Sequence, residues 1–162
     1  DIVVNSLTGY AKIDNEIKIL GDGKPWRPLV HVKDICRSII AVLEAKKKLI
    51  HNQAFNIGDN KENYQIKMIA KKVKKYYPSC DISIAIEDAS DSRDYNVSFN
   101  KLNNVLSFNR VWSLNKGIEE LKNQYEVTNL DKERFEGRLY NRLKQINYLI
   151  KNNILSNTLR RI

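Results

Sequence analysis

Short apolar segments alternate along the chain with longer segments whose apolar residues recur every three or four positions. Segments of the first kind are typical of buried strands, and spacing of the second kind is typical of amphipathic helices. Chains that alternate the two fold as α/β or α+β proteins. Because the strands are few and short, the expected fold is α/β with an incomplete, α+β-like sheet. We expect strands at 17–20, 29–32, 54–57 and 82–86, and helices over 2–13, 33–48, 66–76 and 114–125.

The helix expected over 33–48 carries its apolar side chains on one face. Ile35, Ile39 and Leu43 follow one another at intervals of four residues, as residues on one side of a helix do. A face of this kind normally packs against the rest of the protein. We expect Cys36 to lie in the core as well.

The C-terminal half of the chain predicts further elements. Tyr95, Val97 and Phe99 alternate with polar residues, which is typical of an edge strand. Asn100 and Ser113 are residue types that favour the N-cap position, and we expect each to cap the helix that follows it.

A last amphipathic helix is expected over 135–150. Its apolar residues are spaced by four, four, three and four positions, so they form a single stripe that must lie on another apolar surface. We interpret this helix as an appendage to the main core. The residues of the stripe are Phe135, Leu139, Leu143, Ile146 and Ile150.

The chain has 162 residues and a formal net charge of +9. A length of this order fits one domain, or one domain with a tail. The excess of basic residues predicts an anionic partner, and nucleic acid, anionic lipid and phosphorylated metabolites all qualify. No apolar stretch approaches the ~20 residues that cross a bilayer, so a transmembrane protein is excluded and no membrane partner is expected.

The cysteines and the first residues bear on the cellular compartment of the protein and on its place in a longer polypeptide. Cys36 and Cys80 lie far apart in a chain too large to need disulfides, so we expect reduced thiols and a cytoplasmic protein. The sequence opens at Asp1 with no signal-peptide pattern, and we interpret it as beginning inside something larger.

The imidazoles and thiols are not spaced as metal ligands. His31, His51, Cys36 and Cys80 show none of the close pairings that present several ligands to one zinc ion, so no metal is expected. His31 lies on the strand expected at 29–32, and we interpret it as a hydrogen-bonded structural histidine.

Two partial motifs of dinucleotide enzymes are present, and neither is convincing. Gly21 and Gly23 begin a G-x-G-x-x-G pattern, but Trp26 replaces the third glycine and no helix follows at once. Tyr140 and Lys144 have the Tyr-x-x-x-Lys spacing of hydride-transfer enzymes but lack a serine partner and a cofactor loop. A tight turn and a surface or packing tyrosine are the favoured interpretations.

The four lysines among residues 71–75 lie on the polar side of an expected helix, and two arginines stand near the end of the sequence. Such clusters are usually solvated surfaces. They also leave open an alternative function, a non-catalytic basic module that binds nucleic acid or another polyanion.

The stretch from Gly21 to Asp34 is the most informative part of the sequence. Arg27 stands between two prolines, which restrict the backbone, at the entry to an expected strand and helix. A rigidly held guanidinium suits a phosphate group better than a flexible lysine does.

At this stretch the sequence resembles the C-terminal part of an extended short-chain dehydrogenase/reductase, the family of NAD-dependent nucleotide-sugar epimerases and dehydratases. Arg27 with His31-Val32-Lys33-Asp34 resembles its "R…HV.D" signature, and Ala54 to Gly58 its "fNiG" strand. Asp1 to Leu7, Ile17 to Gly23 and Ser92-Arg93-Asp94 are similar to family segments in the same order, so the resemblance covers roughly residues 1–125.

The resemblance implies roles for six residues in binding a nucleoside diphosphate sugar. An asparagine would touch the diphosphate or the sugar, a strand would flank the base, and two arginines would hold the diphosphate. These residues are Asn5 for the first role, Lys18, Ile19 and Leu20 for the second, and Arg27 and Arg93 for the third.

In this family an N-terminal Rossmann half holds NAD and supplies the catalytic residues. The resemblance therefore implies NAD in the complete enzyme, no cofactor on this chain alone, and no catalytic, cofactor-binding or metal-binding residue within it. Residues 1–126 would form the substrate-binding part and residues 127–162 a helical extension. The expected partners are a nucleotide-diphosphate sugar, the N-terminal half and a second copy of the chain. Whether the reaction is an isomerisation or a dehydration is left open.

Overall fold

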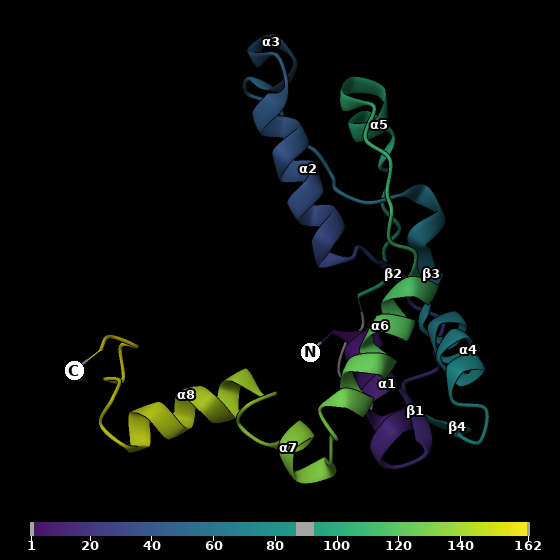
Figure 1. Cartoon of the computed structure of the whole chain (residues 1–162), viewed down its shortest axis with the longest axis vertical. Helices are drawn as coiled ribbons and strands as arrows, with labels where there is room; N and C mark the ends of the chain where they lie inside the picture. Colours follow the sequence, from purple (N-terminus) through teal and green to yellow (C-terminus); the bar gives the residue numbers. More distant parts are fainter. Residues whose placement is uncertain (1, 87–92, 162) are drawn as a thin grey trace.

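In the computed structural model, residues 2–86 and 93–161 are described, and they form helices and two small two-stranded sheets (Figure 1). The strands are β1 (Glu16–Leu20), β2 (Trp26–Pro28), β3 (Asn63–Gln65) and β4 (Asp81–Ala85). The helices are α1 (Val3–Ile13), α2 (Val32–Glu44), α3 (Lys47–Ile50), α4 (Ile66–Tyr76), α5 (Asn100–Leu106), α6 (Leu114–Val127), α7 (Lys132–Glu136) and α8 (Arg142–Lys151). The predicted α/β class is confirmed, and β1, β4, α1, α2, α4 and α6 lie where we expect them.

The core lies between the β1–β4 sheet and three helices. β1 and β4 pair in parallel, with Ile17 opposite Ile82. The side chains of Ile17 and Ile19 are 0% and 2% exposed, whereas Lys18 between them faces solvent, so β1 alternates as its sequence predicts. α1, α4 and α6 supply most of the remaining core, which consists of Val4, Leu7, Ala11, Ile17, Ile19, Ile69, Ala70, Val73, Cys80, Leu114 and Ile118.

A glycine turn connects β1 to β2. Gly21 and Gly23 adopt φ values of 82° and 69°, a left-handed conformation that glycine reaches without steric cost. The Gly23 carbonyl accepts a hydrogen bond of 2.9 Å from the Lys67 N–H, which docks the start of α4 on the turn. β2 then pairs antiparallel with β3, with Arg27 opposite Tyr64.

The strand expected at 29–32 is wrong, because β2 ends at Pro28 and α2 begins at Val32. His31 is the N-cap of α2, and its Nδ1 accepts a hydrogen bond of 3.2 Å from the Lys33 N–H. The first N–H groups of a helix have no partner inside the helix, so an acceptor side chain at this position favours a helix start over a strand.

The apolar face of α2 is exposed. Val32, Ile39 and Leu43 are 63%, 51% and 78% exposed. Our prediction that Cys36 lies in the core is also wrong, since its thiol is exposed. α2 projects from the core together with α3 and α5 (Figure 1), and no described segment covers this face.

The strands expected at 54–57 and 95–99 are wrong as well, since both segments are irregular. Asparagine side chains replace the main-chain partners of a strand. Asn63 accepts from the Val97 N–H and donates to the Val97 carbonyl, both at 3.0 Å, and Asn56 donates to the Ser98 carbonyl at 3.2 Å. An apolar run becomes a strand only beside another strand, and among the described residues neither segment has one.

Two helix caps were expected, and one is confirmed. The Ser113 hydroxyl accepts a hydrogen bond of 3.4 Å from the Lys116 N–H at the start of α6. Asn100 instead becomes the first residue of α5, after Phe99, and no side chain caps that helix. The side-chain oxygen of Asn100 accepts a hydrogen bond from Asn60 and is therefore engaged elsewhere.

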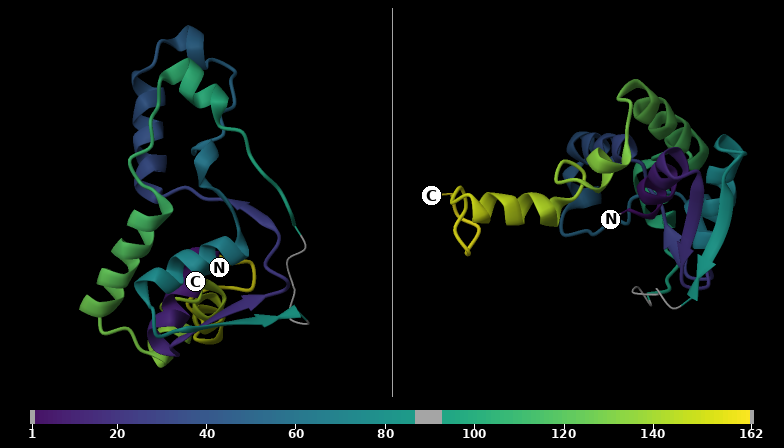
Figure 2. Two further views of the ribbon diagram at one scale, coloured as in Figure 1. Left: turned by 90° about the vertical axis from the view of Figure 1, so that its right-hand side faces the viewer. Right: turned by 90° about the horizontal axis from the view of Figure 1, so that it is seen from below.

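The helix expected over 135–150 is divided into α7 and α8. α7 ends before Gly137, whose backbone is extended, and α8 begins after Asn141, which accepts a hydrogen bond of 3.1 Å from the Lys144 N–H. Two helix ends thus interrupt a continuous apolar stripe. α8 extends away from the core (Figure 2), and none of its residues is buried.

Phe135 anchors α7 to α1. The ring lies directly over Gly9, where a Cβ atom would be 2.2 Å from Phe135 Cζ. The ring also packs edge-on against Tyr10 and Tyr125, with centroids 5.3 and 6.2 Å apart. Only glycine leaves room for the ring in this position.

We expect Gly9→Ala to destabilise the protein by about 1 to 3 kcal/mol, because the added methyl group overlaps the Phe135 ring. Gly117→Ala in α6 is the matched control, since its Cβ would meet only His31 Cδ2, at 3.5 Å. There the better helix propensity of alanine should stabilise the fold by up to about 1 kcal/mol. Urea denaturation measures both changes, and equal effects of the two substitutions would refute the packing argument.

Candidate functional site

Asp34 ties the start of α2 to the segment that precedes α6. Its carboxylate is 1% exposed and accepts hydrogen bonds from the N–H groups of Val111 and Trp112 and from the Arg37 guanidinium, the last at 2.7 Å. Burial alone would raise the pKa of Asp34, but these three donors outweigh it, and the pKa lies below its ordinary value. The final residue of the "HV.D" pattern is therefore structural.

Glu62 holds the same segment from the other side. Its carboxylate is 4% exposed, accepts a hydrogen bond of 3.0 Å from the Leu114 N–H and pairs with the Arg110 guanidinium at 3.0 Å. Burial is the main cause that raises the pKa of Glu62. Burial, followed by the charge of Glu62, raises the pKa of Tyr64 to about 12.

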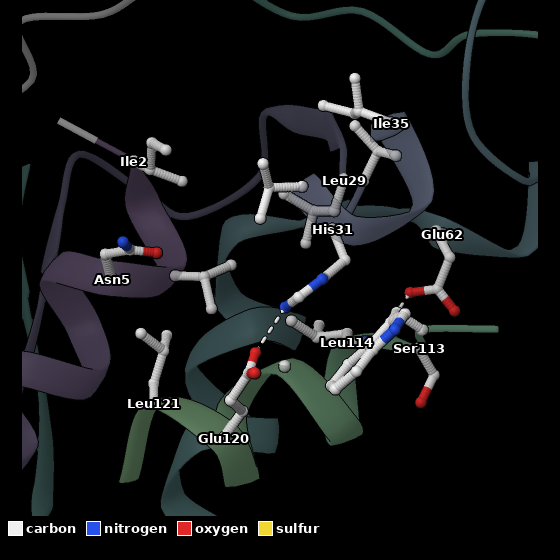
Figure 3. Close-up of a pocket in the computed structure, with 15 residues that line it drawn as sticks. Ile2, Asn5, Leu29, His31, Ile35, Glu62, Ser113, Leu114, Glu120 and Leu121 are labelled. Carbon is white, nitrogen blue, oxygen red and sulfur yellow. Dashed lines mark hydrogen bonds and ion pairs between the residues drawn. The ribbon is translucent and has the colours of Figure 1, made fainter. Parts of the chain in front are cut away.

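A cavity of about 450 Å³ opens between α1, the start of α2 and α6 (Figure 3). Apolar side chains form most of its wall, and a few polar groups converge on it. The labelled polar residues are Asn5, His31, Glu62, Ser113 and Glu120, and the labelled apolar ones are Ile2, Leu29, Ile35, Leu114 and Leu121.

His31 is fixed on both ring nitrogens and on one ring face. Because Nδ1 accepts from the Lys33 N–H, the proton is on Nε2, which donates to Glu120 Oε2 at 2.7 Å. The ring stacks on Trp112 with centroids 4.3 Å apart. The prediction of a hydrogen-bonded structural histidine is confirmed, although the residue caps a helix and does not lie on a strand.

Glu120 is held as an anion. The Lys33 ammonium donates to Glu120 Oε1 and lies 4.2 Å from the centroid of the Trp112 ring. The hydrogen bond from Lys33 is the main cause that lowers the pKa of Glu120, and His31 adds to it. The cavity therefore has a fixed hydrogen-bonded wall with no unpaired base on it.

The structure brings together Arg27 and Arg93, which are 66 residues apart in the sequence. The Arg27 guanidinium donates to the main-chain carbonyl of Arg93 at 2.5 Å and to that of Trp26 at 2.8 Å. Asp94 completes the contact, because its carboxylate accepts a hydrogen bond of 2.7 Å from the Trp26 N–H. The Arg93 main chain thus lies against the Arg27 side chain beside β2, and Arg93 itself is exposed.

The other expected substrate residues line a second hollow, a groove of about 960 Å³. Asn5 contributes to both the cavity and the groove, and Lys18 and Leu20 lie on the exposed face of β1 in the groove. Ile19 is different, because its side chain is in the core. Any contact of Ile19 with a base is therefore made by its main chain.

Sequence reasoning missed Glu62, Arg110, Trp112 and Glu120. Each acts through a partner far away in the sequence, such as His31 for Glu120 at a separation of 89 residues. No local spacing connects such residues.

Tyr140 is a surface tyrosine that packs on Phe135, which agrees with the interpretation that we favour from the sequence. Tyr140 precedes the Asn141 cap and lies outside α8, and the Lys144 ammonium donates to the Glu136 carbonyl at 2.6 Å. The two residues are therefore not neighbours on one helix face.

Neither a metal-binding cluster nor a membrane-spanning helix is present among the described residues. Over 2–86 and 93–161, no three histidine, cysteine or acidic side chains are grouped so that they would hold a metal ion. In the same residues, no helix has the length and apolar character needed to cross a membrane.

We expect Asp34→Asn to destabilise the protein at neutral pH by roughly 1.5 to 3 kcal/mol, the usual size of a hydrogen bond to a charged group. Because the pKa of Asp34 in the folded state lies below 3.8, the ionised carboxylate stabilises the fold above that pH. This stabilisation is lost as the pH falls through the lowered pKa. The difference between wild type and variant should therefore shrink as the pH is lowered from 5 to 2.

Asp22→Asn is the control for this experiment. The hydrogen bond from the Lys24 N–H is the main cause that lowers the pKa of Asp22, but this carboxylate is on the surface. Its removal should change stability little at any pH. An Asp34→Asn effect that stays constant from pH 7 to pH 2 would contradict the assignment.

Comparison with known proteins gives consistent results. Residues 3–58 match the sequence model of the NAD dependent epimerase/dehydratase family. The fold is similar to that of UDP-glucuronic acid 4-epimerase from Bacillus cereus, in complex with UDP-glucuronic acid and NAD, with a TM-score of 0.66 and 24% identity over 79% of this chain and 40% of that one. It is also similar to Helicobacter pylori ADP-L-glycero-D-manno-heptose-6-epimerase, with a TM-score of 0.63 and 15% identity over 76% and 37%.

A third similar structure is dTDP-glucose 4,6-dehydratase from Bacillus anthracis in complex with NAD, with a TM-score of 0.61 and 20% identity over 78% of this chain and 39% of that one. The chain thus spans about two fifths of the length of these enzymes. Residues 3–58 thus resemble the NAD dependent epimerase/dehydratase family in sequence, and the chain shares its fold with solved nucleotide-sugar epimerases and a dehydratase.

Proposed function

We propose that this chain is the substrate-binding part of an NAD-dependent nucleotide-sugar epimerase or dehydratase. Residues 1–126 bind the nucleoside diphosphate sugar, and residues 127–162 form a helical extension. The observation that supports the proposal is the hydrogen bond from the Arg27 guanidinium to the Arg93 carbonyl, which brings two arginine residues together at β2.

Two neighbouring arginines suit a diphosphate. A guanidinium donates two parallel hydrogen bonds to phosphate oxygens, and such charge-assisted bonds are about twice as strong as neutral ones. A substrate held by its diphosphate keeps its sugar in place while the sugar reacts. Two carbonyl groups and the ring of Tyr95 hold the Arg27 guanidinium, whose Cζ lies 5.6 Å from the ring centroid. The Arg27 side chain therefore loses little conformational freedom when a ligand binds.

The remaining substrate contacts follow from the groove. Lys18 and Leu20 present the exposed face of β1 to it, and Asn5 lies where groove and cavity meet. In our proposal the base lies along β1, the diphosphate lies at the arginines and the sugar lies near Asn5.

The cofactor and the reacting groups belong to another part of the enzyme in this proposal. Solved structures of the same fold hold NAD, and an N-terminal Rossmann half would bind it here. The exposed apolar face of α2 is the surface on which we place that half. A cytoplasmic location accompanies the proposal, since both cysteines are free thiols.

The first test is the affinity for a nucleoside diphosphate sugar. Arg27→Ala should weaken binding by roughly 10- to 150-fold, which corresponds to about 1.5 to 3 kcal/mol for a lost hydrogen bond to a charged group. Arg27→Lys keeps the charge but loses the two-pronged geometry, so it should restore only part of the affinity. Isothermal titration calorimetry with UDP-, dTDP-, GDP- and ADP-sugars measures the effect.

Arg160→Ala is the control, because this exposed arginine lies in the extension, far from Arg27 in the sequence. Wild-type affinity in Arg27→Ala would contradict the proposed role. Tight, strongly salt-dependent binding to polynucleotide that excludes sugar nucleotides would favour the alternative of a basic binding module.

The second test concerns the apolar face of α2. An uncovered face of this kind should make the 162-residue chain associate with itself at high concentration. The double substitution Ile39→Asp and Leu43→Lys should shift sedimentation toward the monomer without lowering stability, because both side chains are more than half exposed. A wild-type chain that stays monomeric at millimolar concentration would argue against a docking face.

A further inference from the structure

The groove of about 960 Å³ has two walls from different parts of the chain. Asn5, Lys18 and Leu20 form part of one wall, on α1 and β1. Phe135 and Tyr140 form part of the other, in the extension. The segment expected to flank the base thus faces residues that lie outside the family match at 3–58.

The extension is fixed where it meets the groove. Phe135 fills the space above Gly9 and packs on Tyr10 and Tyr125. Two polar contacts hold α7. The Lys132 ammonium pairs with the Asp14 carboxylate at 3.0 Å, and the Arg134 guanidinium donates to the Thr128 carbonyl at 2.7 Å. This wall is therefore preorganised.

Tyr140 presents an aromatic ring to the groove. The ring packs on Phe135, with centroids 5.9 Å apart and ring planes tilted by 49°. The residue is nevertheless 44% exposed, although tyrosine buries a large apolar area when a partner is available. An aromatic ring that is held by a neighbour and keeps exposed surface can stack with a flat nucleobase.

The charges of the groove do not call for a cationic ligand. Each acidic side chain in its wall has a partner within the protein: Asp14 pairs with Lys132, Glu16 with the Ser83 hydroxyl, and Glu136 with the Tyr10 hydroxyl. The charges of the wall are therefore compatible with an uncharged ring in the groove.

We propose that Tyr140 of the extension stacks on the nucleobase of the bound nucleoside diphosphate sugar and so contributes to base recognition. The inference rests on the proposed function. It adds a contact to the nucleobase from the extension, which lies outside the family match at residues 3–58. The base would lie between Tyr140 and the exposed face of β1.

The experiment compares a probe that carries a base with one that does not. Titration calorimetry on the protein uses UDP, dTDP, GDP and ADP, and inorganic pyrophosphate as the base-free probe. Tyr140→Ala should weaken the best-bound nucleoside diphosphate by roughly 5- to 150-fold, the range that stacking of one base on an aromatic ring implies. Pyrophosphate binding should not change, and Tyr140→Phe should retain the wild-type affinity.

Tyr148→Ala is the matched control, because Tyr148 is 40% exposed and packs on the Arg138 guanidinium of the same extension. It should leave both probes unaffected. Equal weakening of both probes by Tyr140→Ala would show a structural role and overturn the inference. Loss of binding in Arg27→Ala without loss in Tyr140→Ala would overturn the inference and leave the proposed function intact, whereas a wild-type protein that binds no nucleoside diphosphate would refute both.

Discussion

Two buried carboxylates fix the short segment from Arg110 to Leu114, and the rest of the structure depends on that segment. Asp34 accepts hydrogen bonds from the N–H groups of Val111 and Trp112. Glu62 accepts a hydrogen bond from the Leu114 N–H and forms an ion pair with the Arg110 guanidinium. α6 begins at the end of this segment, so the position of α6 in the core follows from these two side chains. Buried acids with several donors specify geometry, because a misplaced segment would leave a charge without partners.

The same segment forms part of the wall of the cavity. Trp112 supports the ring of His31, and α6 carries Glu120 to its other side, so the cavity wall is assembled from three distant parts of the chain. A second long-range contact lies at β2, where the Arg27 guanidinium donates to the Arg93 carbonyl and so holds the segment that begins at Arg93 against the strand. In both places one side chain pairs with a main-chain or side-chain group that is distant in the sequence.

The sequence predicts correctly the helices and strands whose apolar spacing matches their packing in the core. Prediction from the sequence fails where a segment's structure depends on a neighbouring strand or on a side chain far away in the sequence. Ile17 and Ile19 alternate and form a strand because β4 lies beside them. Residues 54–57 have a similar composition but no neighbouring strand among the described residues, and they stay irregular. Arg27 and Arg93 are proposed as site residues through resemblance alone, whereas Glu62 and Glu120 have partners whose identity depends on the tertiary fold. The break at Gly137 was missed because an apolar stripe continues across it.

The exposure of α2 gives the two thiols of the chain different chemical behaviour. Cys80 is in the core, donates to the Ala11 carbonyl at 3.2 Å and has a pKa raised by burial, so it is protected from alkylating reagents. Cys36 lies on the projecting helix with its sulfur open to solvent. The rate at which a maleimide labels Cys36 therefore reports directly whether another surface covers α2. Cys80 does not contribute to this signal, because it is buried.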